Sequence, residues 1–80
     1  MPRFFFHVTG KTVDKDTEGT DLPSAAYAKR EGLKLIGAML NDGFYDTQGT
    51  ALLLDVTDES GLVLFHIDVT ARNAPVGRAA

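Results

Sequence analysis

One helix-forming run lies between two stretches of the chain that favour β-strands. Small or apolar side chains recur along this run at the spacing that gives a helix one buried face. They are Leu22, Ala25, Ala28, Gly32, Leu35, Ile36, Met39 and Leu40. Asp21 or Thr20 can cap the start of the helix, and Pro23 suits its first turn. Because the Asn-Asp-Gly sequence at 41–43 ends the run, we predict one amphipathic helix over residues 24–41.

Two glycines interrupt this helix, and each costs about 1 kcal/mol of helix propensity relative to alanine. Gly32 lies on the buried stripe of the helix, whereas Gly37 does not. A residue without a side chain on the buried face lets the helix backbone approach a sheet closely. We expect Gly32 to serve that packing.

The residues before the helix predict a pair of strands. Residues 3–8 are aromatic and β-prone, and their alternation places Phe4, Phe6 and Val8 on one face. The other face then carries Arg3, Phe5 and His7. A turn at 9–11 leads into a polar return strand over residues 12–16, which we expect at an edge of the sheet.

The residues after the helix predict a second hairpin. Strands over residues 51–57 and 62–69 flank the turn sequence Asp-Glu-Ser-Gly at 58–61. In the last strand, alternation separates an apolar face from a mixed one. The apolar face holds Val63, Phe65, Ile67 and Val69, and the mixed face holds Leu64, His66 and Asp68. Residues 44–50 read as a connecting loop.

The element order ββαββ predicts a single α+β domain over residues 1–70. The two most apolar strands, 3–8 and 62–69, are expected at the centre of a four-stranded sheet. If the strands are numbered as they occur along the chain, their order across the sheet would then be 2-1-4-3, with the helix packed on one face of the sheet. Residues 71–80 are rich in Ala, Pro, Gly and Arg and read as a flexible tail.

Composition narrows the classes of function. The formal net charge of −3 argues against a protein whose affinity comes from neutralising phosphates, so nucleic acid is a disfavoured partner. The chain has no cysteine, which excludes disulfides and thiolate zinc sites. Its three consecutive phenylalanines are too short a run for a signal peptide or a membrane span. We therefore expect a cytoplasmic protein that does not bind a membrane.

Few residues offer chemistry. His7, His66 and Asp68 form the smallest set from which a metal site or a proton-transfer pair could be built. Two histidines in separate strands have no metal-ligand spacing, however, and a histidine in a strand is more often a hydrogen-bonded residue of the sheet. Residues 14–19 imitate the first half of a calcium loop, but the position that needs a glutamate is Ala25. We expect no catalytic residue, metal or cofactor.

The mixed face of the sheet is the strongest candidate for function. Its residues are Arg3, Phe5, His7, Leu64, His66 and Asp68, with Leu53 or Leu54 beside them. Apolar groups ringed by polar ones commonly mark an interaction surface, although such a face can also be ordinary monomer surface. A chain of 80 residues buries a small core, which favours association with a second copy.

Three functions remain open. The first is a non-enzymatic protein-interaction module, a homodimer that binds through the mixed face or through an edge strand at 12–16 or 51–57. The second is a small metal-dependent or acid/base enzyme that uses His7, His66 and Asp68. The third is a nucleic-acid-associated regulator that uses the cluster of basic residues Lys29, Arg30 and Lys34.

Three segments carry a resemblance to a known family. They are the opening Met-Pro-Arg-Phe-Phe-Phe-His at 1–7, Asp-Thr-Glu-Gly-Thr-Asp-Leu-Pro at 16–23, and Asp-Glu-Ser-Gly-Leu-Val-Leu-Phe at 58–65. Over roughly residues 1–69 the chain resembles short bacterial proteins, frequent in rhizobia and their relatives, that consist of a domain of unknown function. Such helices are usually richer in alanine where this chain has Gly32 and Gly37. The resemblance implies no activity, cofactor or catalytic residue.

A looser likeness is to antitoxins of the HicAB type, in which an acidic hairpin leads through Leu-Pro into an alanine-rich helix. The Pro-x-x-Gly-Cys-like segment of those proteins is missing, because Pro23 is followed by Ser-Ala-Ala. A likeness at the level of the fold alone is a weak indication of function.

Overall fold

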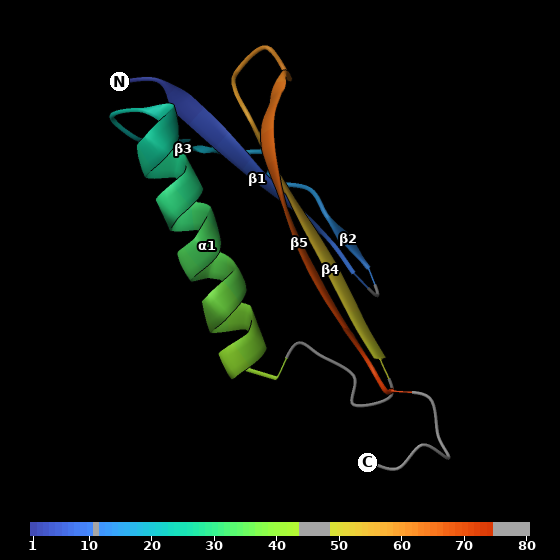
Figure 1. Ribbon diagram of the computed structural model, residues 1–80. Helices are drawn as coiled ribbons and strands as arrows, with labels where there is room; N and C mark the ends of the chain where they lie inside the picture. Colours follow the sequence, from blue (N-terminus) through green and yellow to red (C-terminus); the bar gives the residue numbers. More distant parts are fainter. Residues whose placement is uncertain (11, 44–48, 75–80) are drawn as a thin grey trace.

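The computed structural model describes residues 1–10, 12–43 and 49–74. Along the chain they form β1 (Arg3–Thr9), β2 (Val13–Asp14), β3 (Thr20–Asp21), α1 (Ala25–Asn41), β4 (Gly49–Thr57) and β5 (Val63–Arg72). The helix α1 packs on one face of an antiparallel sheet (Figure 1). The predicted α+β class, with one helix covering a sheet, is therefore confirmed.

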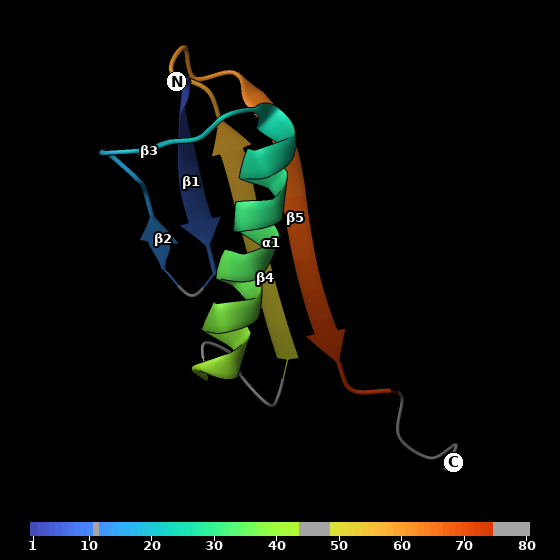
Figure 2. The ribbon, with the colours of Figure 1, turned by 90° about the vertical axis from the view of Figure 1, so that its left-hand side faces the viewer.

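The sheet has the order β2-β1-β4-β5, and β3 also pairs with β1. The predicted order 2-1-4-3 is wrong, because β4 lies between β1 and β5 (Figure 2). The strand predicted as an edge over residues 51–57 is thus a central one. Both β1 and β5 run antiparallel to β4 and hence point the same way. If they were neighbours they would form a parallel pair, which is slightly less stable per residue.

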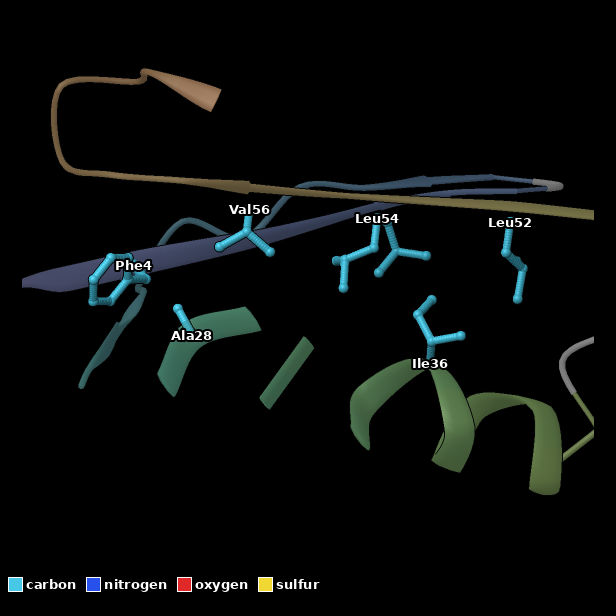
Figure 3. Close-up of a cluster of buried hydrophobic side chains, with 7 residues drawn as sticks. Phe4, Ala28, Ile36, Leu52, Leu54 and Val56 are labelled. Carbon is cyan, nitrogen blue, oxygen red and sulfur yellow. The ribbon is translucent and has the colours of Figure 1, made fainter. Parts of the chain in front are cut away.

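The hydrophobic core lies between α1 and the inner strands (Figure 3). Its buried side chains are Phe4, Val8, Ala28, Ile36, Leu52, Leu54 and Val56. Leu54 and Val56 are both 0% exposed, so alternate residues of β4 form the centre of the molecule. Ile67 and Val69 of β5 are only partly buried beside them. This difference in burial marks β4 as an inner strand and β5 as an outer one.

Gly32 lies where α1 comes closest to the sheet, as its position on the stripe predicts. A Cβ atom at this position would lie 3.1 Å from Cδ2 of Leu54 and 3.2 Å from Cδ1 of Ile67. Both distances are tighter than ordinary van der Waals contact. Gly37 has no atom of another part of the described chain within 4 Å of such a Cβ. Only the first of the two helix glycines is therefore needed for packing.

The N-cap of the helix lies three residues after Asp21, the later of the two predicted caps. Ser24 is the N-cap, and its side chain accepts a hydrogen bond of 3.3 Å from the Tyr27 N–H. Thr20 and Asp21, predicted as caps, instead form β3 on the outer side of β1, and Pro23 precedes the cap. The end of the helix agrees with the sequence, because α1 stops at Asn41 and Gly43 follows with a φ of +90°.

The strand boundaries also differ from expectation. The return strand predicted over 12–16 is reduced to two residues in β2, and β4 already includes residues 49 and 50 of the predicted loop. The strand β5 continues to Arg72, two residues into the predicted tail. Residues 44–48 and 75–80, which hold the rest of that loop and most of that tail, lie outside the described residues. No helix in the described part of the chain has the length and hydropathy of a membrane span.

The contact at Gly32 predicts the effect of enlarging this residue. Substitution Gly32→Leu should destabilise the fold by about 1 to 3 kcal/mol, because the added atoms would push α1 away from Leu54 and Ile67. Urea denaturation followed by circular dichroism measures the change. The control is Gly37→Ala, which should stabilise the fold by up to about 1 kcal/mol, because alanine forms helix better and meets no neighbour. Equal effects at both positions would contradict the packing role of Gly32.

Candidate functional site

The sheet has one face that α1 does not cover, here called the open face. Residues directly opposite each other in an antiparallel pair lie on the same face. The register places His7 opposite Asp55 and Asp55 opposite His66, so these three residues form one row across β1, β4 and β5. Neighbouring rows add Phe5 opposite Thr57, and Asp68 opposite Leu53. By alternation Arg3 shares this face with Phe5 and His7. Of the predicted surface residues, the open face thus carries Arg3, Phe5, His7, His66 and Asp68.

Leu64 does not belong to the open face, contrary to the prediction. The register shifts between Val56 and Thr57, whose partners are Phe65 and Val63, and this bulge leaves Leu64 between them. Leu64 packs against the core cluster, whereas Val63 lies opposite Thr57 of the open face and is 41% exposed. The regular alternation assumed for this strand is therefore wrong at its start, since a bulge brings two successive side chains toward one side.

His66 pairs with a residue that the sequence did not single out. Its Nδ1 atom lies 2.5 Å from Oδ1 of Asp55 on the neighbouring strand. Both side chains remain partly exposed, at 59% for His66 and 30% for Asp55. Asp68, the acid predicted to accompany His66, lies one row along, opposite Leu53. Asp55 could have been identified as the partner of His66 only if the register of β4 and β5 were known.

His7 is held by the backbone and by its neighbours. Its Nδ1 atom accepts a hydrogen bond of 3.1 Å from the Asp16 N–H. The other ring nitrogen, Nε2, lies 3.4 Å from the Thr57 hydroxyl. The imidazole also stacks on Phe5, with the two ring centroids 6.4 Å apart. Both nitrogens of His7 therefore have partners within the sheet.

The two histidines do not share a site. One strand, β4, separates His7 from His66, which places their backbones roughly 9 to 10 Å apart. Across the described ranges, no three His, Cys, Asp or Glu side chains gather as metal ligands would. The set His7, His66 and Asp68 therefore does not meet at a common point.

The Asp16 carboxylate accepts three hydrogen bonds from backbone N–H groups, one of them from the strand β1. Its Oδ2 atom accepts from the Phe6 N–H at 3.1 Å, and its Oδ1 atom accepts from the N–H groups of Glu18 and Gly19 at 3.1 and 3.0 Å. Partial burial raises the pKa of this carboxyl. The three backbone hydrogen bonds and the nearby His7 ring lower it by more, so the pKa of Asp16 lies below its ordinary value of 3.8.

Arg3 lies on the open face as well, at the start of β1, where the neighbouring strand is β3. Its guanidinium donates from Nε and Nη2 to the two carboxylate oxygens of Asp21, at 3.1 and 3.3 Å. The Nη1 atom donates to the Glu18 carbonyl at 2.7 Å. This forked contact fastens β3 to the start of β1.

The outer edge of β1 is therefore closed along its length. β3 pairs with its first residues, Arg3 and Phe4, and β2 pairs with its last, Val8 and Thr9. Between them, the Asp16 carboxylate accepts a hydrogen bond from the outward-pointing Phe6 N–H. A further strand cannot add to this edge of the sheet without displacing these contacts.

The outer edge of β5 differs from the edge of β1. The Phe6 N–H points away from β4, so the residues of β1 on either side of Phe6 are the ones that hydrogen-bond to β4. Along β4, the residues that bond to β1 alternate with those that bond to β5. By this alternation Phe65, Ile67 and Val69 bond to β4. The N–H and C=O groups of His66, Asp68 and Thr70 then point outward. Among the described residues, no strand pairs with this side of β5.

The geometry of Asp16 predicts a pH dependence. Its folded pKa lies below that of the unfolded chain, so it stabilises the fold fully above pH 3.8, and this contribution is lost as the pH falls through the folded pKa. Substitution Asp16→Asn should cost about 1 to 2 kcal/mol at neutral pH, because the amide cannot accept all three hydrogen bonds.

Urea denaturation of wild type and variant across acid pH measures this difference, which should shrink below pH 3.8. The matched control is Asp14→Asn in exposed β2, which should change stability little at any pH. A gap between wild type and Asp16→Asn that stays constant into acid would show that the charge of Asp16 does not stabilise the fold.

Comparison with known proteins gives one match. Residues 3–70 match a family described as a domain of unknown function, DUF6894. No curated protein and no solved structure matches the chain. The resemblance to a family of unknown function is thus confirmed, and function has to be argued from the geometry of the two edges and the open face.

Proposed function

We propose that this chain, which belongs to the DUF6894 family, is a non-enzymatic protein-interaction module that binds an extended strand of its partner along the outer edge of β5. Strand addition uses the main-chain groups of an exposed sheet edge, and side chains on alternate positions select the partner. The proposal takes the protein as cytoplasmic, as expected from its sequence.

The observation that carries the proposal is the contrast between the two edges of the sheet. The edge of β1 is closed by β2, Asp16 and β3. The edge of β5 presents ten residues without proline or lysine, which are common means of blocking strand addition. Along this edge, residues whose backbone groups point outward alternate with residues whose apolar side chains lie on the core face. A partner strand would therefore extend both the hydrogen bonding of the sheet and the apolar core.

The open face supports the proposal less strongly than the edge. Its polar groups already have partners, since His66 contacts Asp55 and His7 contacts the Asp16 N–H. Phe5 is half-buried and stacks on His7. This face therefore offers a partner few side chains that are not already held within the sheet.

The other two functions receive less support from the geometry. For an enzyme, His66 pairs with Asp55, whereas the two ring nitrogens of His7 lie near other partners, the Asp16 N–H and the Thr57 hydroxyl. For a nucleic-acid regulator, two of the three basic helix residues have partners on the helix itself. Lys34 lies 3.6 Å from Glu31, and Arg30 lies 5.2 Å above the ring of Tyr27.

Blocking the edge of β5 tests the proposal. Substitution Thr70→Pro removes an outward N–H while the bonds of Val69 and Ala71 to β4 remain. It should weaken any strand-mediated complex by tenfold or more, because the proline ring also obstructs the incoming strand. Substitution Thr70→Ala keeps the N–H and should leave affinity within a few-fold of wild type.

The measurement is the dissociation constant of the purified complex, whether with a second copy or with another protein, by calorimetry or sedimentation. Thermal unfolding of Thr70→Pro, near that of wild type, shows that the fold is retained. A complex that binds Thr70→Pro as tightly as wild type would place recognition elsewhere and remove the proposal.

A further inference from the structure

We infer that the partner at the edge of β5 is a second copy of this chain, paired antiparallel about a twofold axis at Ile67. This inference rests on the proposed function, since it needs β5 to accept a strand. It adds the identity of the partner and the register of the pairing. The result would be one continuous sheet with both helices on the same face, because an axis perpendicular to the sheet keeps each face on its own side.

The side chains of β5 complement each other in this register. With Ile67 opposite the partner's Ile67, each His66 lies opposite the partner's Asp68, and Phe65 lies opposite the partner's Val69. Polar residues thus meet polar ones on the open face, and apolar residues meet on the core face. His66 and Asp68 are also residues whose backbone groups point outward, so they form the hydrogen-bonded pairs of the new ladder.

Neighbouring registers are less favourable. An axis at Asp68 sets that carboxylate against its own copy, and like charges directly opposite destabilise a strand pair. An axis at His66 sets Asp68 opposite Leu64, which packs against the core. An axis at Val69 sets His66 opposite Arg72. Of these four registers, the axis at Ile67 is the one that sets His66 opposite Asp68 on the open face and Phe65 opposite Val69 on the core face, with Thr70 opposite Leu64 at the ends.

The position of α1 fits the same arrangement. The helix lies over β4 and β5, since the Cβ position of Gly32 lies near both Leu54 and Ile67. In the joined sheet the two helices would be separated by about two strand spacings, roughly 9 to 10 Å. Packed helices are separated by about 8 to 10 Å. The two helices would therefore contact each other directly above the new strand pair.

The flank of α1 that faces this contact carries an exposed leucine. In Figure 2 the helix lies in front of the sheet, with its start at the top and β5 to its right. A right-handed helix advances about 100° per residue, so Leu33, next after the sheet-facing Gly32, lies on the β5 side. Leu33 is 52% exposed. Because Gly32 lies against Ile67, the axis at Ile67 also brings Leu33 close to the partner's Leu33.

The first experiment is sedimentation equilibrium of the purified chain. Wild type should be a dimer of the 8.6 kDa chain, and both Leu33→Asp and Asp68→Lys should shift it toward monomer by tenfold or more in dissociation constant. The matched control is Val13→Asp, which places the same acid on a 71% exposed apolar residue at the closed edge and should leave the dimer intact.

The second experiment tests the register by cross-linking, which is clean because the chain has no native cysteine. Equal amounts of His66→Cys and Asp68→Cys, mixed and oxidised, should form a covalent dimer, whereas each variant alone should form far less. Efficient cross-linking of His66→Cys alone, or of Asp68→Cys alone, would move the axis and overturn the register.

The outcomes separate this inference from the proposed function. A wild type that stays monomeric at every concentration overturns the inference, yet leaves the proposed function intact if Thr70→Pro loses binding to another protein. A wild-type dimer that persists unchanged in Thr70→Pro overturns both. A dimer that is lost in Thr70→Pro and Leu33→Asp, and cross-links only in the mixture, supports both.

Discussion

The close approach of α1 to the sheet at Gly32 determines how the rest of the molecule is arranged. It lets the helix lie directly on Leu54 and Ile67, and alternate residues of β4 complete the core. The helix lies on one face of the sheet, over β4 and β5, so the open face is left uncovered by it. The same placement brings an exposed flank of the helix to the β5 side, where no described element covers it.

The other half of the architecture depends on two polar side chains. Asp16 takes the one outward N–H in the middle of β1, and Arg3 holds β3 to its start. Together they turn an irregular polar segment into a cover for an otherwise free edge. The cover uses single side chains where a full strand would need several more residues, which suits so short a chain.

Local patterns in the sequence predict much of this fold, because they depend on neighbours along the chain. The period of the helix, its end before Gly43 and the packing role of Gly32 all follow from such patterns. Strand order does not follow from local patterns, since it depends on which strand can pair antiparallel on both sides. The apolar character of residues 62–69 did not indicate their outer position.

The site residues show the same division between local and long-range information. Arg3, Phe5, His7, His66 and Asp68 lie on the open face by simple alternation, and Leu64 leaves it because a bulge interrupts that alternation. Asp55 and Asp16 act through partners distant in sequence, His66 and Phe6. In the sequence, Asp16 is one acid among several. Its role comes from its hydrogen bond to the Phe6 N–H of β1, which only the fold brings near it.

The closed edge of β1 also sets a limit on growth. A sheet with two available edges can add neighbours without end and so form filaments, whereas a sheet with a single available edge is saturated after one pairing. The carboxylate of Asp16 and the guanidinium of Arg3 thus do more than hold one loop in place. They make any assembly through β5 finite, so that association stops at two sheets instead of propagating into an insoluble fibre.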